Sequence, residues 1–192
     1  MAADTLNWVG QSLASGRYRV TVLLGEGGMG AVYKAHDAHL DNEVVVKIPK
    51  TGLVSDHEFT GRFAREVRSL VRLAHAHIVR VLDVGEHDGL PFAVMQYLNG
   101  GSLRDRLSRM SGGAAALAEL PAWLLGVADA LDYIHLQGYV HRDVKPDNIL
   151  FDAAGHVYLG DFGIAKALAA SESSAGLDAT FKTSAGPTRP ET

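Results

Sequence analysis

Residues 141–148 (HRDVKPDN) bring together three side chains whose chemistry suits phosphoryl transfer. Asp143 can accept the proton of a hydroxyl nucleophile, Lys145 can neutralise charge on a transferred phosphate, and Asn148 can offer its amide oxygen to Mg²⁺. Asp161, the first residue of a DFG triplet, can supply a carboxylate as a further ligand for a hard cation. The sequence therefore predicts a metal-assisted centre with Asp143 as base and with Asn148 and Asp161 as metal ligands.

A glycine-rich segment lies far upstream, at residues 25–32 (GEGGMGAV). Glycine has no side chain, so a hairpin built from these residues can bring its backbone close to phosphate groups. Alone, such a pattern is more often an ordinary turn-rich hairpin. Here it precedes Lys47, which ends the apolar run VVVK and needs a counter-charge because an unpaired buried ammonium is costly. Glu66 is the candidate partner.

The order of these motifs resembles that of protein kinase catalytic domains over about residues 18–162. Residues 27–35 (GGMGAVYKA) and Lys145 make the chain most similar to the eukaryotic-like (Hanks-type) serine/threonine kinases of bacteria, because tyrosine kinases usually carry another residue at this lysine. The resemblance implies an enzyme that transfers the γ-phosphoryl group of ATP to Ser or Thr hydroxyls of protein substrates. Its cofactors would be ATP and Mg²⁺, with Mn²⁺ as an alternative metal. Lys47 would hold the phosphates in place and pair with Glu66.

The resemblance also implies a nucleotide pocket with Met95 at its back, Leu150 as its floor, and a hinge at residues 96–98 whose backbone binds adenine. Gln96 stands where Glu is common in the family. Val45 stands where Ala is usual, so its extra bulk could tighten or shift nucleotide binding. The residues expected to bind the nucleotide are Leu24, Gly25, Gly27, Gly28, Gly30, Val32, Val45, Lys47, Met95, Gln96, Leu98 and Leu150.

Several further residues are implied to regulate activity or to support the site. In kinases regulated through their activation loop, cations at the positions of Arg142, Lys166 and Arg62 gather around a phosphorylated residue, although Lys166 and Arg62 could equally be solvated charges. The candidate phosphorylated residues are Thr180, Thr183 and Ser184. His141 is implied to pack in an apolar column with Phe162 and Leu70 rather than to act as a base.

The elements that must position these residues can be read from hydrophobic spacing. A helix is expected around Phe59–Val71, and Ser102 can cap another over residues 103–109. The run at 111–114 is expected to be a loop, and a helix is expected to begin at Pro121. Its buried face is expected to carry Trp123, Leu124, Val127, Leu131 and Ile134. Strands are expected at 18–24, 31–37, 43–48, 79–86 and 91–97, with a hairpin formed by 149–152 and 157–160.

The resulting fold class is α+β, a two-lobe protein-kinase-like fold with a complete β-rich small lobe and an incomplete helical large lobe. The expected divisions are an N-terminal extension at 1–17, the small lobe at 18–98, a partial large lobe at 99–168, and a truncated activation segment at 169–192. Beyond Lys166 the resemblance decays. The chain is therefore expected to be truncated after the DFG segment.

Composition limits the other classes of function. The 192 residues are 47% hydrophobic with a net charge of −4, which argues against nucleic acid as a partner. Cysteine is absent, so disulfides and thiolate metal sites are excluded. No apolar run approaches the roughly 18 residues of a membrane span, and residues 1–16 lack the pattern of a signal peptide. A cytoplasmic location is the expectation.

Two alternatives compete with a protein kinase. One is a nucleotide-binding, pseudokinase-like or regulatory module that has lost transfer activity with its large-lobe helices and that self-associates or binds a partner kinase. The other is a small-molecule kinase of similar fold. Arg142 and the Lys145-Pro146 step disfavour the second alternative, because both are similar to protein kinases.

Overall fold

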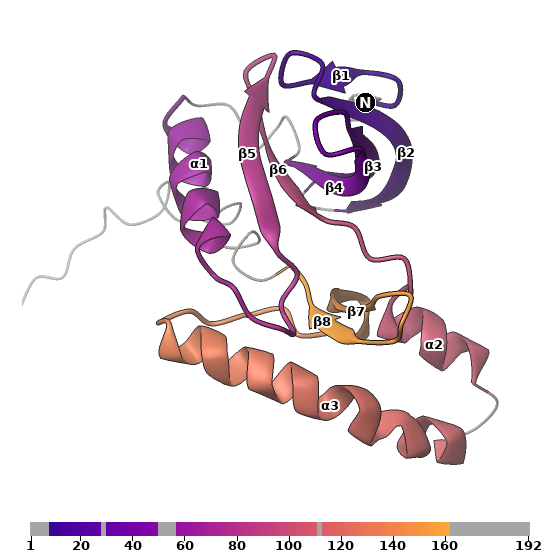
Figure 1. Ribbon diagram of the computed structural model, residues 1–192. Coiled ribbons are helices and arrows are strands. Elements are labelled where there is room, and N and C mark those ends of the chain that lie inside the picture. Colours follow the sequence, from indigo (N-terminus) through magenta and orange to yellow (C-terminus); the bar gives the residue numbers. More distant parts are fainter. Residues whose placement is uncertain (1–7, 28–29, 50–56, 111–112, 162–192) are drawn as a thin grey trace, which may run out of the picture.

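The computed structural model describes residues 8–27, 30–49, 57–110 and 113–161. A curved antiparallel sheet with one helix beside it forms the small lobe, and two helices with a short hairpin lie beneath it (Figure 1). The strand order is β1-β2-β3-β4-β6-β5. The strands are β1 (Ser12–Leu13), β2 (Tyr18–Gly27), β3 (Gly30–Asp37), β4 (Asn42–Pro49), β5 (Val81–His87) and β6 (Leu90–Gln96).

All five strands that the sequence predicts in this lobe are confirmed, with small shifts at their ends. The turn between β5 and β6 shows why the prediction succeeds. Asp88 and Gly89 both adopt positive φ angles, of 50° and 77°. Two successive positive φ values give a turn whose twist matches that of the strands, and Asp-Gly is a favoured pair for it.

The structure adds a strand that hydrophobic spacing did not predict. β1 pairs with the start of β2, and the N–H of Gly10 donates to the carbonyl of Val20 at 2.9 Å. Trp8 is only 4% exposed, its ring lies 5.3 Å from that of His87, and Leu13 is fully buried. Trp8 and Leu13 therefore belong to the small-lobe core.

Helix α1 (His57–Val71) confirms the helix predicted after the third predicted strand. Phe63, Val67 and Leu70 are buried and lie in a core that continues into the large lobe, where it includes Val127 and Ile134 of helix α3 (Gly113–Leu136). This core is separate from the one that contains Trp8 and Leu13, and it lies between the sheet and the two large-lobe helices. The packing of α1 into it therefore couples the two lobes.

The large-lobe part contains α2 (Leu103–Arg109), α3 (Gly113–Leu136), a short 3₁₀ turn η2 (Pro146–Asn148), and the hairpin of β7 (Ile149–Phe151) and β8 (Val157–Leu159). The predicted cap of α2 is confirmed in detail. The Ser102 hydroxyl accepts the N–H of Asp105, and the Asp105 carboxylate accepts the N–H of Ser102. This reciprocal arrangement satisfies two backbone donors at the start of the helix.

The predicted start of α3 is wrong. The helix begins at Gly113, so residues 113–114 are helical rather than part of a loop, and Pro121 lies inside the helix. Residues 114–120 (AAALAEL) are rich in strong helix formers, which outweigh the hydrogen bond that Pro121 cannot donate.

The buried face of α3 is also narrower than the sequence indicates. Val127, Ala130 and Ile134 are buried, as the spacing predicts for the first and last of them. Leu124, expected on the buried face, is 44% exposed, and Leu125 is 73% exposed. Within the described ranges, no helix combines the length and apolar character needed to cross a membrane.

Candidate active site

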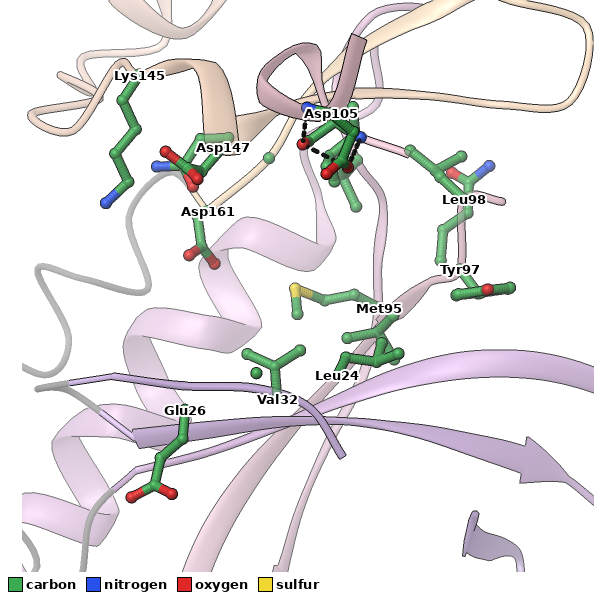
Figure 2. A pocket seen from close by; sticks show the side chains of 18 residues that line it. Leu24, Glu26, Val32, Met95, Tyr97, Leu98, Asp105, Lys145, Asp147 and Asp161 are labelled. Carbon is green, nitrogen blue, oxygen red and sulfur yellow. Dashed lines mark hydrogen bonds between the residues drawn. The ribbon is translucent and has the colours of Figure 1, made fainter. Parts of the chain in front are cut away.

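A cavity of about 810 Å³ lies where β2, β3 and β4 face the β7–β8 hairpin and residues 141–148, which correspond to the catalytic loop of the predicted family (Figure 2). Apolar residues, among them Leu24, Val32 and Met95, form one end. Charged residues, among them Lys145 and Asp161, form the other. Cavities of this size with one apolar and one polar end are typical of small-molecule sites.

Most of the predicted nucleotide-binding residues line this cavity. They are Leu24, Gly25, Val32, Val45, Met95, Gln96, Leu98 and Leu150, and the predicted Lys145, Asn148 and Asp161 join them. Gly27, Gly30 and Lys47 are not among the lining residues, and Gly28 lies outside the described residues.

Gly30 has a packing role. A Cβ atom built on it would lie 2.1 Å from the carbonyl oxygen of Ile48 on the neighbouring strand β4, and its φ angle is +148°. Both observations require glycine, because the strands could not approach this closely around a side chain.

The sequence did not select six of the residues that line the cavity, namely Glu26, Val79, Ser102, Asp105, Asp147 and Gly160. The pattern of Ser102 and Asp105 indicates helix capping, and it does not indicate that these two residues also line the cavity. Asp147 lies inside the 141–148 motif, which is the signal that could have identified it. Val79 is an apolar strand-flanking residue like many others, so no sequence signal singles it out.

Lys47 on β4 is 6% exposed, and its Nζ lies 2.6 Å from Oδ1 of Asp161. The counter-charge required for a buried ammonium is therefore present, and it comes from the DFG aspartate. The expected partner was Glu66. Its backbone belongs to α1, but its side chain lies outside the described part of the chain, so the Lys47–Glu66 pair stays a prediction.

The catalytic-loop side chains form a compact cluster around Asp143. Lys145 Nζ donates to Asp143 Oδ2 at 2.6 Å, and Asn148 Nδ2 donates to the same oxygen at 3.0 Å and to the Asp143 carbonyl at 2.7 Å. The hydrogen bond from Lys145 is the largest cause that lowers the pKa of Asp143 below its ordinary value, and the same contact raises the pKa of Lys145. Asp143 is thus a carboxylate at neutral pH.

The fold of the loop holds this cluster in place. The N–H of Asn148 donates to the carbonyl of Lys145 at 2.9 Å, which closes the η2 turn. Arg104 on α2 donates through Nε and Nη2 to both oxygens of Asp147, at 2.5 and 2.8 Å. This two-point contact lowers the pKa of Asp147 and ties the start of α2 to the loop.

His141 is buried, as the family resemblance implies, and it supports the loop. Phe162 lies outside the described residues, so the apolar column of His141 with Phe162 and Leu70 stays a prediction. Its side chain is 2% exposed, and Nδ1 accepts the N–H of Asp143 at 3.2 Å. Since Nδ1 is the acceptor, Nε2 carries the hydrogen and donates to the carbonyl of Gly160 at 2.9 Å. Burial lowers the pKa of this imidazole, so His141 stays neutral and connects the catalytic loop to Gly160, which lies between β8 and Asp161.

Two residues in the site have left-handed backbone conformations. Arg142 has a φ angle of 68° and Asp161 one of 62°. Non-glycine residues adopt this region at an energetic cost, and such strain gathers at functional sites. The Arg142 side chain is exposed. The side chain of Arg62 and residues Lys166, Thr180, Thr183 and Ser184 lie outside the described residues.

Comparisons with known proteins agree on one family. The sequence matches the protein kinase domain across residues 18–187. It is 40% identical over 166 residues to the probable serine/threonine-protein kinase PknB of Bifidobacterium longum, covering 82% of this chain and 24% of that protein. It is 39% identical over 157 residues to the serine/threonine-protein kinase PrkC of Bacillus subtilis, with the same two coverages. The chain thus spans about a quarter of the length of these curated relatives.

Solved structures give the same result for the fold. A crystal structure of the Mycobacterium tuberculosis PknI kinase domain, in a double-mutant form, matches with a TM-score of 0.70 at 33% identity. That match covers 81% of this chain and 63% of the PknI chain. Rad53 1–466 in complex with AMP-PNP matches with a TM-score of 0.64 at 29% identity, covering 78% of this chain and 39% of that one.

Proposed function

The chain belongs to the protein kinase family, and from this premise we propose that its domain transfers the γ-phosphoryl group of ATP to Ser or Thr hydroxyls of protein substrates. The observation that carries this proposal is that one cavity holds the Lys145 and Asn148 side chains of the catalytic loop together with Asp161. The names of the curated relatives, which are serine/threonine-protein kinases, support the choice of acceptor.

The cavity has the two ends that ATP requires. The adenine ring is flat and apolar, and Leu24, Val32 and Leu150 offer matching surfaces beside the hinge at 96–98. The triphosphate is strongly anionic, and the ammonium of Lys145 lies at the other end of the cavity (Figure 2). In the proposed complex the backbone of β2 at Gly25 faces the phosphates. The Lys47 side chain moves to a position between Asp161 and the nucleotide, and there it binds the phosphates.

Kinases of this family use ATP and a divalent metal ion, and the donor set here fits a hard cation. The Asn148 amide nitrogen is bonded to Asp143, which directs the amide oxygen to the opposite side. Asp161 uses Oδ1 for Lys47 and has a second carboxylate oxygen. We propose that Asn148 and Asp161 hold Mg²⁺, with Mn²⁺ as an alternative. A bound ion of this kind neutralises charge that develops on phosphate oxygens.

Asp143 orients the acceptor hydroxyl in the proposed reaction. The depressed pKa of Asp143 makes this carboxylate a weak base, so it aligns the hydroxyl and accepts its proton only late, as the oxygen–phosphorus bond forms. Lys145, already bound to Asp143, neutralises the transferring phosphoryl group. Catalysis therefore depends on positioning and charge neutralisation rather than on a covalent intermediate.

Regulation and location follow as parts of the same proposal. Arg142 is exposed and directly precedes Asp143, so a phosphate on Thr180, Thr183 or Ser184 could dock there, assisted by Lys166 or Arg62. Because the donor is ATP, we also propose that the domain works in the cytoplasm.

The proposal is tested by phosphate transfer to a Ser/Thr protein substrate, measured on the full-length protein. Asp143→Asn should abolish transfer and leave ATP affinity within about twofold, because Asp143 faces the acceptor rather than the nucleotide. Asp88→Asn is the matched control: it makes the same chemical change at an exposed turn between β5 and β6. Full transfer by Asp143→Asn would refute the assigned role, and loss of transfer in both variants would indicate misfolding.

A further inference from the structure

Tyr139 connects the segment before the catalytic loop to helix α1 of the small lobe. Its hydroxyl donates to Ser69 Oγ at 3.0 Å, and both side chains are half-buried. The two residues are separated by 70 positions in the sequence. In Figure 1 the C-terminal end of α3, which Tyr139 follows, lies on the same side of the molecule as α1.

The position of Tyr139 is fixed by the turn that ends α3. Gly138 adopts a φ angle of 80°, and the N–H of Tyr139 donates to the carbonyl of Ile134 at 2.8 Å. The Tyr139 ring packs against the core that the two lobes share. Two residues later, His141 hydrogen bonds to the backbone of both Asp143 and Gly160. Tyr139 is therefore anchored to the same rigid segment that carries Asp143.

Ser69 lies on α1 beside residues that pack into the core shared by the two lobes. Val67 and Leu70 beside it are buried, and Glu66 lies one helical turn earlier. Other contacts between the lobes are made by the loop that follows α1: the N–H of Val79 donates to the carbonyl of Leu159, and the N–H of Leu159 donates to that of His77. Those backbone bonds fix the loop, whereas the Tyr139–Ser69 bond fixes the helix itself.

We propose that Tyr139 is a positioning residue for phosphoryl transfer. Its hydroxyl fixes the rotation of α1 about the helix axis relative to the catalytic-loop segment. It thereby fixes the position of the helix from which the Glu66 side chain would reach Lys47. Tyr139 touches no reacting atom in this scheme and acts only through α1. The expected effect on turnover rests on the proposed function. The hydrogen bond between Tyr139 and Ser69, called the tether from here on, can be tested without an activity measurement.

Hydrogen exchange of the α1 amides tests the tether directly. Tyr139→Phe removes only the hydroxyl, and it should speed exchange across residues 61–71 by about two- to tenfold, the range that follows from the net contribution of one hydrogen bond. Ser69→Ala removes the acceptor of the same hydrogen bond and should also speed exchange of the α1 amides. The double variant should exchange less fast than the two single effects combined would give, because both single variants lack the Tyr139–Ser69 bond. Tyr158→Phe is the control: it removes a hydroxyl that donates to Asp152 in the β7–β8 hairpin.

Turnover gives the second measurement. In the full-length protein, Tyr139→Phe should lower kcat by a similar two- to tenfold factor and leave the KM for ATP nearly unchanged, since α1 affects alignment of the phosphates more than adenine binding. Unchanged α1 exchange in Tyr139→Phe, or an equal change in Tyr158→Phe, would overturn the tether. Faster α1 exchange in Tyr139→Phe, combined with a wild-type protein that transfers no phosphate, would instead support the tether and refute the proposed function.

Discussion

Lys47 and Asp161 lie 114 residues apart in the sequence, yet their side chains meet at 2.6 Å. The contact joins β4 of the small lobe to Asp161, two residues after β8, and so bridges the two lobes. The partners differ in burial, since the Lys47 side chain is 8% exposed and that of Asp161 is 35% exposed. Water can therefore reach the carboxylate much more easily than the ammonium.

This difference predicts an asymmetry between two substitutions. Asp161→Ala should lower the free energy of unfolding by about 1–3 kcal/mol more than Lys47→Met does, because it leaves a buried charge without its partner. Lys47→Met leaves a carboxylate that water can solvate. Urea unfolding of both variants gives the comparison. Equal destabilisation would indicate that another carboxylate neutralises Lys47, with Glu66 as the candidate.

The ion pairs of the catalytic loop predict how two carboxylates titrate. Lys145 lowers the pKa of Asp143, so Lys145→Met should move the titration of Asp143 to higher pH, towards its ordinary value. Arg104→Met should do the same to Asp147 and leave Asp143 nearly unchanged. NMR titration of the aspartate carboxyl carbons in each variant measures both shifts.

The sign of the linkage follows from these lowered pKa values. A carboxyl group with a depressed pKa in the folded state stabilises the fold at pH values above its unfolded pKa, and this contribution is lost as the pH falls through the folded value. The pairs at Asp143 and Asp147 should therefore weaken only in acid. A loss of stability within the neutral pH range that disappears in Lys145→Met would contradict this assignment.

Gly30 provides a test of the close strand approach. Gly30→Ala should lower the free energy of unfolding by about 1–3 kcal/mol, because its Cβ would collide with the Ile48 carbonyl and its backbone would be strained. Gly27→Ala is the matched control in the same hairpin, where an added Cβ meets nothing within 4 Å. Thermal melting of the two variants should separate them clearly. Similar melting temperatures would show that β3 and β4 can adjust at this point.

Nucleotide binding should be visible as thermal stabilisation. ATP with Mg²⁺ at about a hundred times the dissociation constant should stabilise the folded domain by roughly 2.7 kcal/mol. Chelation of the metal should remove much of this effect, because Asn148 and Asp161 would then contribute no bridge to the phosphates. A folded sample whose melting temperature does not respond to ATP would argue against the assignment of the cavity.

The sequence predicted best those features that depend on residues close together in the chain. The Ser102–Asp105 cap and the Asp88-Gly89 turn were found because each is specified by its own few residues. The cluster of Asp143, Lys145 and Asn148 follows the same rule, since one short motif contains all three residues, and their catalytic roles stay a prediction. The cavity lining followed from the family resemblance, which carries long-range information that periodicity lacks.

The features that the sequence did not predict depend on tertiary contacts. Pro121 was taken as a helix start because its local preference is strong, but the alanine-rich residues before it extend α3. Leu124 was assigned to the buried face from its spacing alone, whereas burial depends on what packs against the helix. The contact of Lys47 with Asp161 and that of Tyr139 with Ser69 join distant segments, so no local pattern could indicate them.

The packing of Trp8 has a practical consequence for where this domain is considered to begin. The match to the kinase family starts at residue 18, but Trp8 and Leu13 fill the top of the small-lobe core. A protein cut at the family boundary would lose both side chains and the β1 pairing, and each large apolar burial contributes about 1.5–3 kcal/mol. We therefore expect the unit that folds stably to include residue 8 rather than to begin at residue 18.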